Sequence, residues 1–201
     1  RHLLPSGQYT KDETMPKVLK FAAQSLTALL YVAVLTIAPA PLSSAADSGL
    51  DKLKWHEEPR AVPDTLFQDG EGKDISIADF AGKVLVVNLW ATWCAPCIRE
   101  MPTLDALQAD LGGDRLHVIA LSQDREGARV AAPFIEKNGW SNLALYVSDG
   151  TTFARAAKIR GLPTTLIISP DGREVARLEG TAEWNDPEIK QALSKLLSPE
   201  G

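Results

Sequence analysis

The stretch Lys83–Pro102, KVLVVNLWATWCAPCIREMP, constrains the fold more than any other part of the chain. Its first part, Lys83–Trp90, is an apolar run rich in valine, which is typical of a fully buried strand. After Cys94–Cys97 a helical pattern continues through Leu104 and Leu107. The two cysteines of this stretch therefore lie where a central strand gives way to the first turn of a helix.

This placement of Cys94 and Cys97 predicts redox chemistry. Two side chains at this spacing in a first helical turn share a face, and their separation suits a disulfide. The free N–H groups and the positive end of the helix dipole favour an anion, and a thiolate at Cys94 is such an anion. Pro96 fits the first turn, where its missing N–H costs little. We therefore expect a dithiol–disulfide exchange site, in which Cys97 resolves a mixed disulfide formed at Cys94.

Two other roles for the cysteine pair are less favoured by the sequence. A structural disulfide across so short a loop removes little entropy from the unfolded chain. A zinc site needs two further ligands, and the three histidines of the chain, His2, His56 and His117, do not form a ligand pair. We therefore predict no metal site.

Residues 1–46 are interpreted as an N-terminal extension with a signal peptide or a membrane anchor. A short basic stretch, Met15–Lys20, precedes an apolar segment, Leu26–Ala38, and Ser44–Ala46 offers small residues for cleavage. The span Phe21–Ala38 is near the lower limit for a transmembrane helix, so an uncleaved anchor is the alternative. Both interpretations predict export to the periplasm, where disulfides persist. The formal net charge of −5 argues against nucleic acid as a partner.

The polar stretch 47–60 is interpreted as a linker, with His56 solvated, and 61–201 as the folded domain. Thr65–Phe67 and Ile75–Ile77 flank a turn and predict a hairpin at the edge of the sheet. His117 is expected to pack at the edge of the core rather than to act in catalysis. Later strands are expected at 116–121, 143–147, 164–168 and 174–178, and helices at 125–137, 151–158 and 186–197. This order predicts an α/β fold with a central mixed sheet and helices on both faces.

The strings VVNLWATWCAPCIREMP and GLPTTLIISPDG, with the order of elements between them, resemble the TlpA/ResA-like branch of the thioredoxin superfamily. The resemblance covers about Val62–Leu197. It implies a thioredoxin-like fold with an N-terminal β-hairpin extension and an inserted helix–strand unit. It also implies an exported, often membrane-tethered thiol-disulfide oxidoreductase. No cofactor is expected, because the redox-active disulfide Cys94–Cys97 carries the electrons itself.

The resemblance assigns roles to single residues. Cys94 matches the exposed nucleophile and Cys97 the buried resolving thiol. Pro163 matches a cis-proline beside the disulfide, and a cis bond there would turn the backbone of Leu162 toward an incoming peptide.

Two residues of the motif complete the expected substrate-binding set. Trp93 is the aromatic residue that flanks the first cysteine, and Pro96 lies between the two cysteines. Simple packing is the alternative role of Trp93.

Glu100 is the expected proton carrier. It falls three residues beyond Cys97, so it shares the helix face of that thiol. A partly buried carboxylate with a raised pKa could exchange protons with Cys97, whereas a solvated glutamate would only complement the helix dipole. Thioredoxins carry a buried aspartate at the position of Asn88, six residues before Cys94. Because asparagine cannot take up a proton, that role falls to Glu100.

The resemblance implies a specific reductant that is kept reduced by a membrane electron donor. Its implied substrates are protein dithiols and disulfides, such as apocytochrome c awaiting haem or the copper-site assembly proteins of cytochrome oxidase. Two alternatives stay open: a general thiol oxidase or isomerase of secreted proteins, and a thiol-based copper-binding carrier. A copper carrier is expected to place a further Cys, Met or His near the site, and the nearby Met101 is more typical of core packing.

Overall fold

The computed structural model describes residues 49–148 and 150–197. The N-terminal extension expected over 1–46 lies outside these residues. Among the residues that are described, no helix is long and apolar enough to cross a membrane.

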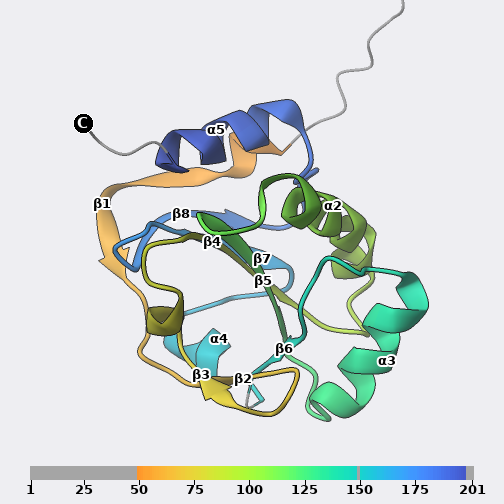
Figure 1. Cartoon of the computed structure of the whole chain (residues 1–201). Helices are drawn as coiled ribbons and strands as arrows, with labels where there is room; N and C mark the ends of the chain where they lie inside the picture. Colours follow the sequence, from red (N-terminus) through yellow and green to blue (C-terminus); the bar gives the residue numbers. More distant parts are fainter. Residues whose placement is uncertain (1–48, 149, 198–201) are drawn as a thin grey trace, which may run out of the picture. The chain divides into compact units, whose positions relative to one another are not determined.

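The described residues form an eight-stranded mixed sheet with the order β1-β8-β7-β4-β5-β6-β2-β3 (Figure 1). β4 pairs in parallel with β5 and antiparallel with β7, so it lies at the centre of the sheet. The strands are β1 (Lys54–Ala61), β2 (Phe67–Asp69), β3 (Asp74–Ile75), β4 (Val84–Trp90), β5 (Leu116–Ser122), β6 (Tyr146–Val147), β7 (Thr164–Ile168) and β8 (Arg173–Glu179).

The helices cover both faces of this sheet, as the sequence predicted. α2, α3 and α5 contribute buried side chains to one core, whereas α4 contributes to the other. Their bounds are α2 (Ala95–Leu111), α3 (Ala128–Asn138), α4 (Thr152–Ala156) and α5 (Pro187–Leu197), with short 3-10 turns η1 (Leu50–Lys52) and η2 (Ile77–Phe80).

β4 is buried along its whole length because both of its faces are covered. Val84, Val86 and Trp90 belong to the core under α2, α3 and α5, and Leu85 and Leu89 to the core with α4. This two-sided burial explains the continuous apolar run, since a strand covered on one face only would alternate. The cysteine motif follows directly, so a fully buried strand holds the start of α2 in place.

The hairpin and the inserted unit lie in the expected segments with different bounds: β2 begins at Phe67 rather than Thr65, β3 ends at Ile75, and β6 is limited to Tyr146–Val147. β2 pairs antiparallel with β3, and β2 also pairs with β6, so the hairpin extends the sheet at the β6 edge. α3 and β6 form the helix–strand unit between β5 and β7. The thioredoxin-like fold is therefore confirmed.

The linker expected over 47–60 is wrong for its second half. Lys54–Ala61 forms β1, which pairs antiparallel with β8 at the opposite edge of the sheet (Figure 1). The register shifts between Trp55 and Arg60, so the strand bulges in its middle. An edge strand with mostly exposed side chains carries no apolar alternation, which is why its sequence looked like a linker.

Candidate active site

Cys94 and Cys97 form a disulfide at the start of α2, with 5.3 Å between their Cα atoms. Cys94 is the N-cap residue, and its Sγ accepts a hydrogen bond of 3.3 Å from the backbone N–H of Cys97. The end of the helix therefore directs an N–H donor at the sulfur that is expected to carry negative charge. Cys97 is fully buried and Cys94 is 5% exposed, so only Cys94 offers solvent any of its surface.

The expected substrate-binding residues differ in exposure. The Trp93 side chain is 71% exposed, which excludes packing as its main role, and Pro96 is half-buried in the first turn of α2. An indole so open to solvent beside a disulfide is available to a partner. The motif therefore presents an exposed apolar side chain on the residue directly before Cys94.

The Leu162–Pro163 peptide bond is cis, as the resemblance implied. Pro163 is buried and Leu162 is half-buried, and the carbonyl oxygen of Pro163 accepts from the N–H of Gly180 at 3.0 Å. β7 begins at the next residue, Thr164, which pairs with Leu89 near the end of β4. Strand pairing therefore brings this loop to the end of β4 from which the redox motif continues.

Glu100 is 2% exposed, so the alternative of a solvated glutamate on the first turns of α2 is wrong. Its Oε1 accepts from Asn88 Nδ2 at 2.8 Å, and its Oε2 accepts from the N–H of Ala182 and from Trp184 Nε1, both at 3.2 Å. Burial raises the pKa of Glu100 to about 7, and the negative charge of Glu183 adds to the rise. The three donors oppose it without cancelling it. The carboxyl therefore changes its protonation near neutral pH.

Asn88 connects Glu100 to the strand that follows the cis-proline. It is fully buried in β4, and its Nδ2 also donates to Thr165 Oγ1 at 2.9 Å. Asn88 and Thr165 are direct partners in the β4–β7 ladder. The residue that distinguishes this chain from ordinary thioredoxins is thus bonded to the expected proton carrier.

The sequence interpretation missed a polar cluster at the end of β4. Asp124 is 4% exposed, and it accepts from the N–H of Thr92 at 3.0 Å, from Thr92 Oγ1 at 2.7 Å and from Ser122 Oγ at 2.9 Å. Asp124 thereby fixes the residue before Trp93. Because β4 and β5 are parallel, the residues that follow their carboxyl ends lie close together. A search of the sequence for polar residues at these two positions could have identified Asp124.

His117 and Met101 take the packing roles predicted for them. His117 stacks on Phe80, and its Nε2 shares a hydrogen bond of 2.7 Å with the hydroxyl of Tyr146. Burial lowers the pKa of His117, and the charge of Lys83 adds to this. Met101 is fully buried in the core. Within 49–148 and 150–197, no group of three Cys, His, Asp or Glu side chains is arranged to hold a metal ion.

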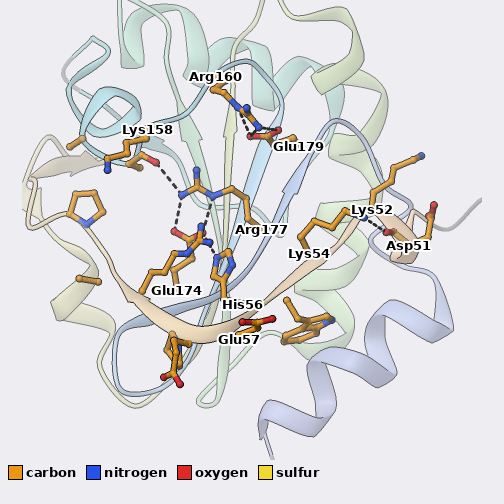
Figure 2. A pocket seen from close by; sticks show the side chains of 18 residues that line it. Asp51, Lys52, Lys54, His56, Glu57, Lys158, Arg160, Glu174, Arg177 and Glu179 are labelled. Atoms are coloured by element: carbon orange, nitrogen blue, oxygen red, sulfur yellow. Dashed lines mark hydrogen bonds and ion pairs between the residues drawn. The ribbon is translucent and has the colours of Figure 1, made fainter.

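His56 contradicts the expectation that it is solvated. Its side chain is 6% exposed, and its Nε2 lies 2.8 Å from Glu174 Oε1. Arg177 donates to both carboxylate oxygens of Glu174 at 2.8 Å and to the carbonyl of Ala157 at 3.0 Å. Figure 2 shows this triad in the hollow between β1, β8 and the residues after α4. The triad joins the edge strand β1 to the sheet, and the hollow contains none of the expected site residues.

Residues 59–175 match the family model described as the AhpC/TSA family. The match includes both cysteines, Glu100 and the cis-proline, and it covers more than half of the chain. The chain belongs to this family.

Within it, the chain is similar to proteins named thiol-disulfide oxidoreductase ResA. The one from Halalkalibacterium halodurans is 31% identical over 135 residues, which cover 67% of this chain and 74% of the relative. That from Bacillus anthracis is 30% identical over 137 residues, covering 68% of this chain and 77% of the relative. The chain is therefore a TlpA/ResA-like thiol-disulfide oxidoreductase of the thioredoxin superfamily.

Solved structures show the same fold. A crystal structure of a thio-disulfide isomerase from Thermus thermophilus matches with a TM-score of 0.60 at 22% identity, covering 71% of this chain and 98% of that one. At this identity the match shows only the fold of this ResA-like oxidoreductase. Its substrate has to be inferred from the geometry of the site.

Proposed function

We propose that this oxidoreductase reduces disulfides in exported proteins, with Cys94 as nucleophile, Cys97 as resolving thiol and Glu100 as proton carrier. One arrangement carries the proposal. Cys94, the slightly exposed half of the disulfide, caps α2, and one turn after Cys97 lies a carboxyl, Glu100, whose pKa burial raises to about 7. Such a site combines a stabilised thiolate with a local proton acceptor.

In the reduced enzyme, the Cys94 thiolate attacks one sulfur of the substrate disulfide. A mixed disulfide forms, and the first substrate sulfur leaves as a thiolate that takes a proton from solvent. Cys97 then attacks Cys94 Sγ, which releases the second substrate sulfur and leaves the Cys94–Cys97 disulfide. The substrate gains two electrons and the enzyme loses two, so a separate dithiol donor must reduce the enzyme again.

Glu100 serves the second step, because Cys97 has to lose its proton before it attacks. Cys97 is fully buried, so bulk water has little access to its thiol. Glu100 follows one turn later on the same helix, and its pKa near 7 lets it accept that proton and later return it. The proton thus stays within the buried site during exchange.

The exposed face of the site fits an extended peptide. The Trp93 indole and the half-buried Leu162 supply apolar contacts, Pro96 lies between the two cysteines in the chain, and the buried Pro163 matches the cis-proline that the resemblance places beside the disulfide. The backbone of Leu162 would offer strand-like hydrogen bonds to a substrate segment. We therefore propose protein disulfides as substrates and the dithiol itself as the only redox group, with no cofactor.

The cellular role proposed here is the assembly of exported redox proteins. It rests on similarity to the ResA proteins and on the signal or anchor sequence expected over 1–46. The proposed location is the periplasm, in soluble form or tethered to the inner membrane. The proposed partners are apocytochrome c or copper-site assembly proteins, together with a membrane electron donor.

Mixed-disulfide trapping tests the proposed division of labour. Cys97→Ser leaves the nucleophile but removes the resolving thiol, so it should accumulate covalent complexes with substrate proteins, visible on non-reducing gels and identified by mass spectrometry. Cys94→Ser is the matched control and should capture none. Equal capture by both variants, or no capture by Cys97→Ser, would contradict the assigned roles.

A further inference from the structure

Among the residues that the structure describes, the buried amide of Asn88 has one atom without a hydrogen-bond partner. Its Nδ2 uses both hydrogens, one toward Glu100 Oε1 and one toward Thr165 Oγ1, whereas its Oδ1 is buried and receives no donor from any described residue. An unmatched acceptor in the interior is costly, and native proteins contain few of them. The unmatched Oδ1 of Asn88, which lies beside Glu100, therefore needs an explanation.

The hydrogen bonds around Glu100 fit only its ionised form. Three groups of the described chain bond to the carboxyl, and all of them donate to it: Asn88 Nδ2, the N–H of Ala182 and Trp184 Nε1. When Glu100 takes up a proton, its new O–H needs an acceptor and meets donors instead. A backbone N–H and an indole N–H cannot become acceptors. Asn88 is the one of the three partners that can, because an amide carries a donor and an acceptor in a single plane.

We propose that the Asn88 side-chain amide turns over when Glu100 is protonated, so that its Oδ1 accepts the Glu100 O–H. Oδ1 then takes the position of Nδ2, where the hydroxyl of Thr165 can turn and donate to it. Before and after the rotation one polar atom of Asn88 is unmatched, first Oδ1 and then Nδ2. After the rotation, the Glu100 O–H no longer faces the N–H of Asn88. The number of unmatched Asn88 atoms stays the same.

The surroundings allow Glu100 to drive this rotation alone. Asn88 and Thr165, which face it from β4 and β7, are uncharged, and Cys97 on its own helix is held in the disulfide. Within the described part of the chain, Glu183, in the segment between β8 and α5, is the charged residue whose charge raises the pKa of Glu100. Asn88 is thus a positioning residue that bonds the carboxyl in both of its protonation states. Its rotation also changes its hydrogen bond with Thr165, two residues beyond Pro163.

The inference extends the proposed role of Glu100, but its test needs neither substrate nor turnover. In the oxidised protein, the Glu100 side-chain carboxyl carbon and the Asn88 side-chain amide are followed by NMR from pH 5 to 9. Both should titrate with one midpoint, and the Asn88 amide hydrogens should lose their contact with Thr165 on the acid side. Asn142 is the matched control, since its Nδ2 bonds the carboxylate of Asp105 at 2.8 Å in an exposed setting. Its amide should not change over this range.

Two substitutions sharpen the test. Trp184→Phe removes a group that can only donate to the carboxylate, so Glu100 should become roughly a tenfold weaker acid. Asn88→Leu removes a hydrogen-bond partner of both the ionised and the protonated carboxyl. The acidity of Glu100 should therefore change several-fold less in this variant than in Trp184→Phe. The rotation is overturned if the wild-type Asn88 signals stay constant while Glu100 titrates, or if Asn88→Leu weakens the acid as much as Trp184→Phe does. The wild-type titration decides the question even where a variant does not fold.

Discussion

Glu100 and Glu174 are both 2% exposed, yet their environments move their pKa values in opposite directions. Burial raises the pKa of Glu100 to about 7, since its neutral N–H donors lower the pKa by less than burial raises it. Burial also raises the pKa of Glu174, but the hydrogen bonds and charges of Arg177 and His56 outweigh it and lower the pKa overall. The same kind of side chain therefore has a raised pKa in α2, where we propose it as the proton carrier, and a lowered pKa at the sheet edge, where it is held as an anion. Neutral donors leave a buried carboxyl able to titrate, whereas a neighbouring cation fixes its charge.

The largest effect should come from removing the cation beside Glu174. Arg177→Leu leaves a buried carboxylate without its counterion, which should lower the free energy of unfolding by about 4 kcal/mol at pH 7. Protonation of Glu174 should relieve part of this loss in acid. Urea unfolding at pH 7 and at pH 4 measures both effects. Arg160→Met, which breaks the exposed pair with Glu179, is the matched control and should cost at most about 1 kcal/mol. Equal losses for the two variants would remove the distinction between buried anion and surface pair.

Glu100→Gln should change the pH dependence of stability. The pKa of Glu100 is higher in the folded protein than in the unfolded chain, so its favourable contribution is complete below the unfolded value of 4.5 and is lost as pH rises through about 7. Relative to wild type, the glutamine variant should therefore gain up to about 3 kcal/mol between pH 4 and pH 9. Parallel stability curves from chemical denaturation would show that Glu100 does not titrate near neutrality.

Glu100→Gln should also change the pH dependence of the exchange rate, which is measured independently of its stability. Without a titrating carboxyl, the rate of exchange with a disulfide substrate should lose its inflection near pH 7. Stopped-flow measurements that use the change in tryptophan fluorescence can follow this step. An inflection of unchanged size and midpoint would assign the proton transfer to another group.

The smallest effect on stability is expected at Trp93. Its side chain is 71% exposed, so Trp93→Ala should leave the free energy of unfolding within about 0.5 kcal/mol of wild type. Its exchange rate with protein disulfides should fall, whereas the rate with a small disulfide such as oxidised glutathione should not. An equal fall for both substrates would place Trp93 in the chemistry rather than in substrate docking.

Local patterns predicted much of the fold. The apolar run of β4, the turn between β2 and β3 and the amphipathic α5 each lie within one stretch of sequence, and the structure has all three. β1 was missed because it is a strand only through its pairing with β8, more than a hundred residues later. No periodicity within an exposed edge strand could reveal that partner.

The site shows the same limit. The spacing of Cys94, Cys97 and Glu100 on one helix was visible in the sequence, and the resemblance placed the cis-proline. The titration of Glu100 depends on Ala182 and Trp184, which lie more than eighty residues away in the chain. Only the folded chain shows that its oxygens are held by neutral donors. Asp124, which fixes Thr92 from the end of β5, was also not foreseen, although the parallel pairing of β4 and β5 could have pointed to it.

The equilibrium reduction potential of the Cys94–Cys97 pair, measured against glutathione at pH 7, tests the proposed reductase most directly. We predict a value around −270 mV, in the thioredoxin range, or between this and the glutaredoxins. An enzyme with such a potential gives electrons to protein disulfides and depends on a dedicated donor. A value near −120 mV would contradict the proposal and would make the protein an oxidant of secreted thiols.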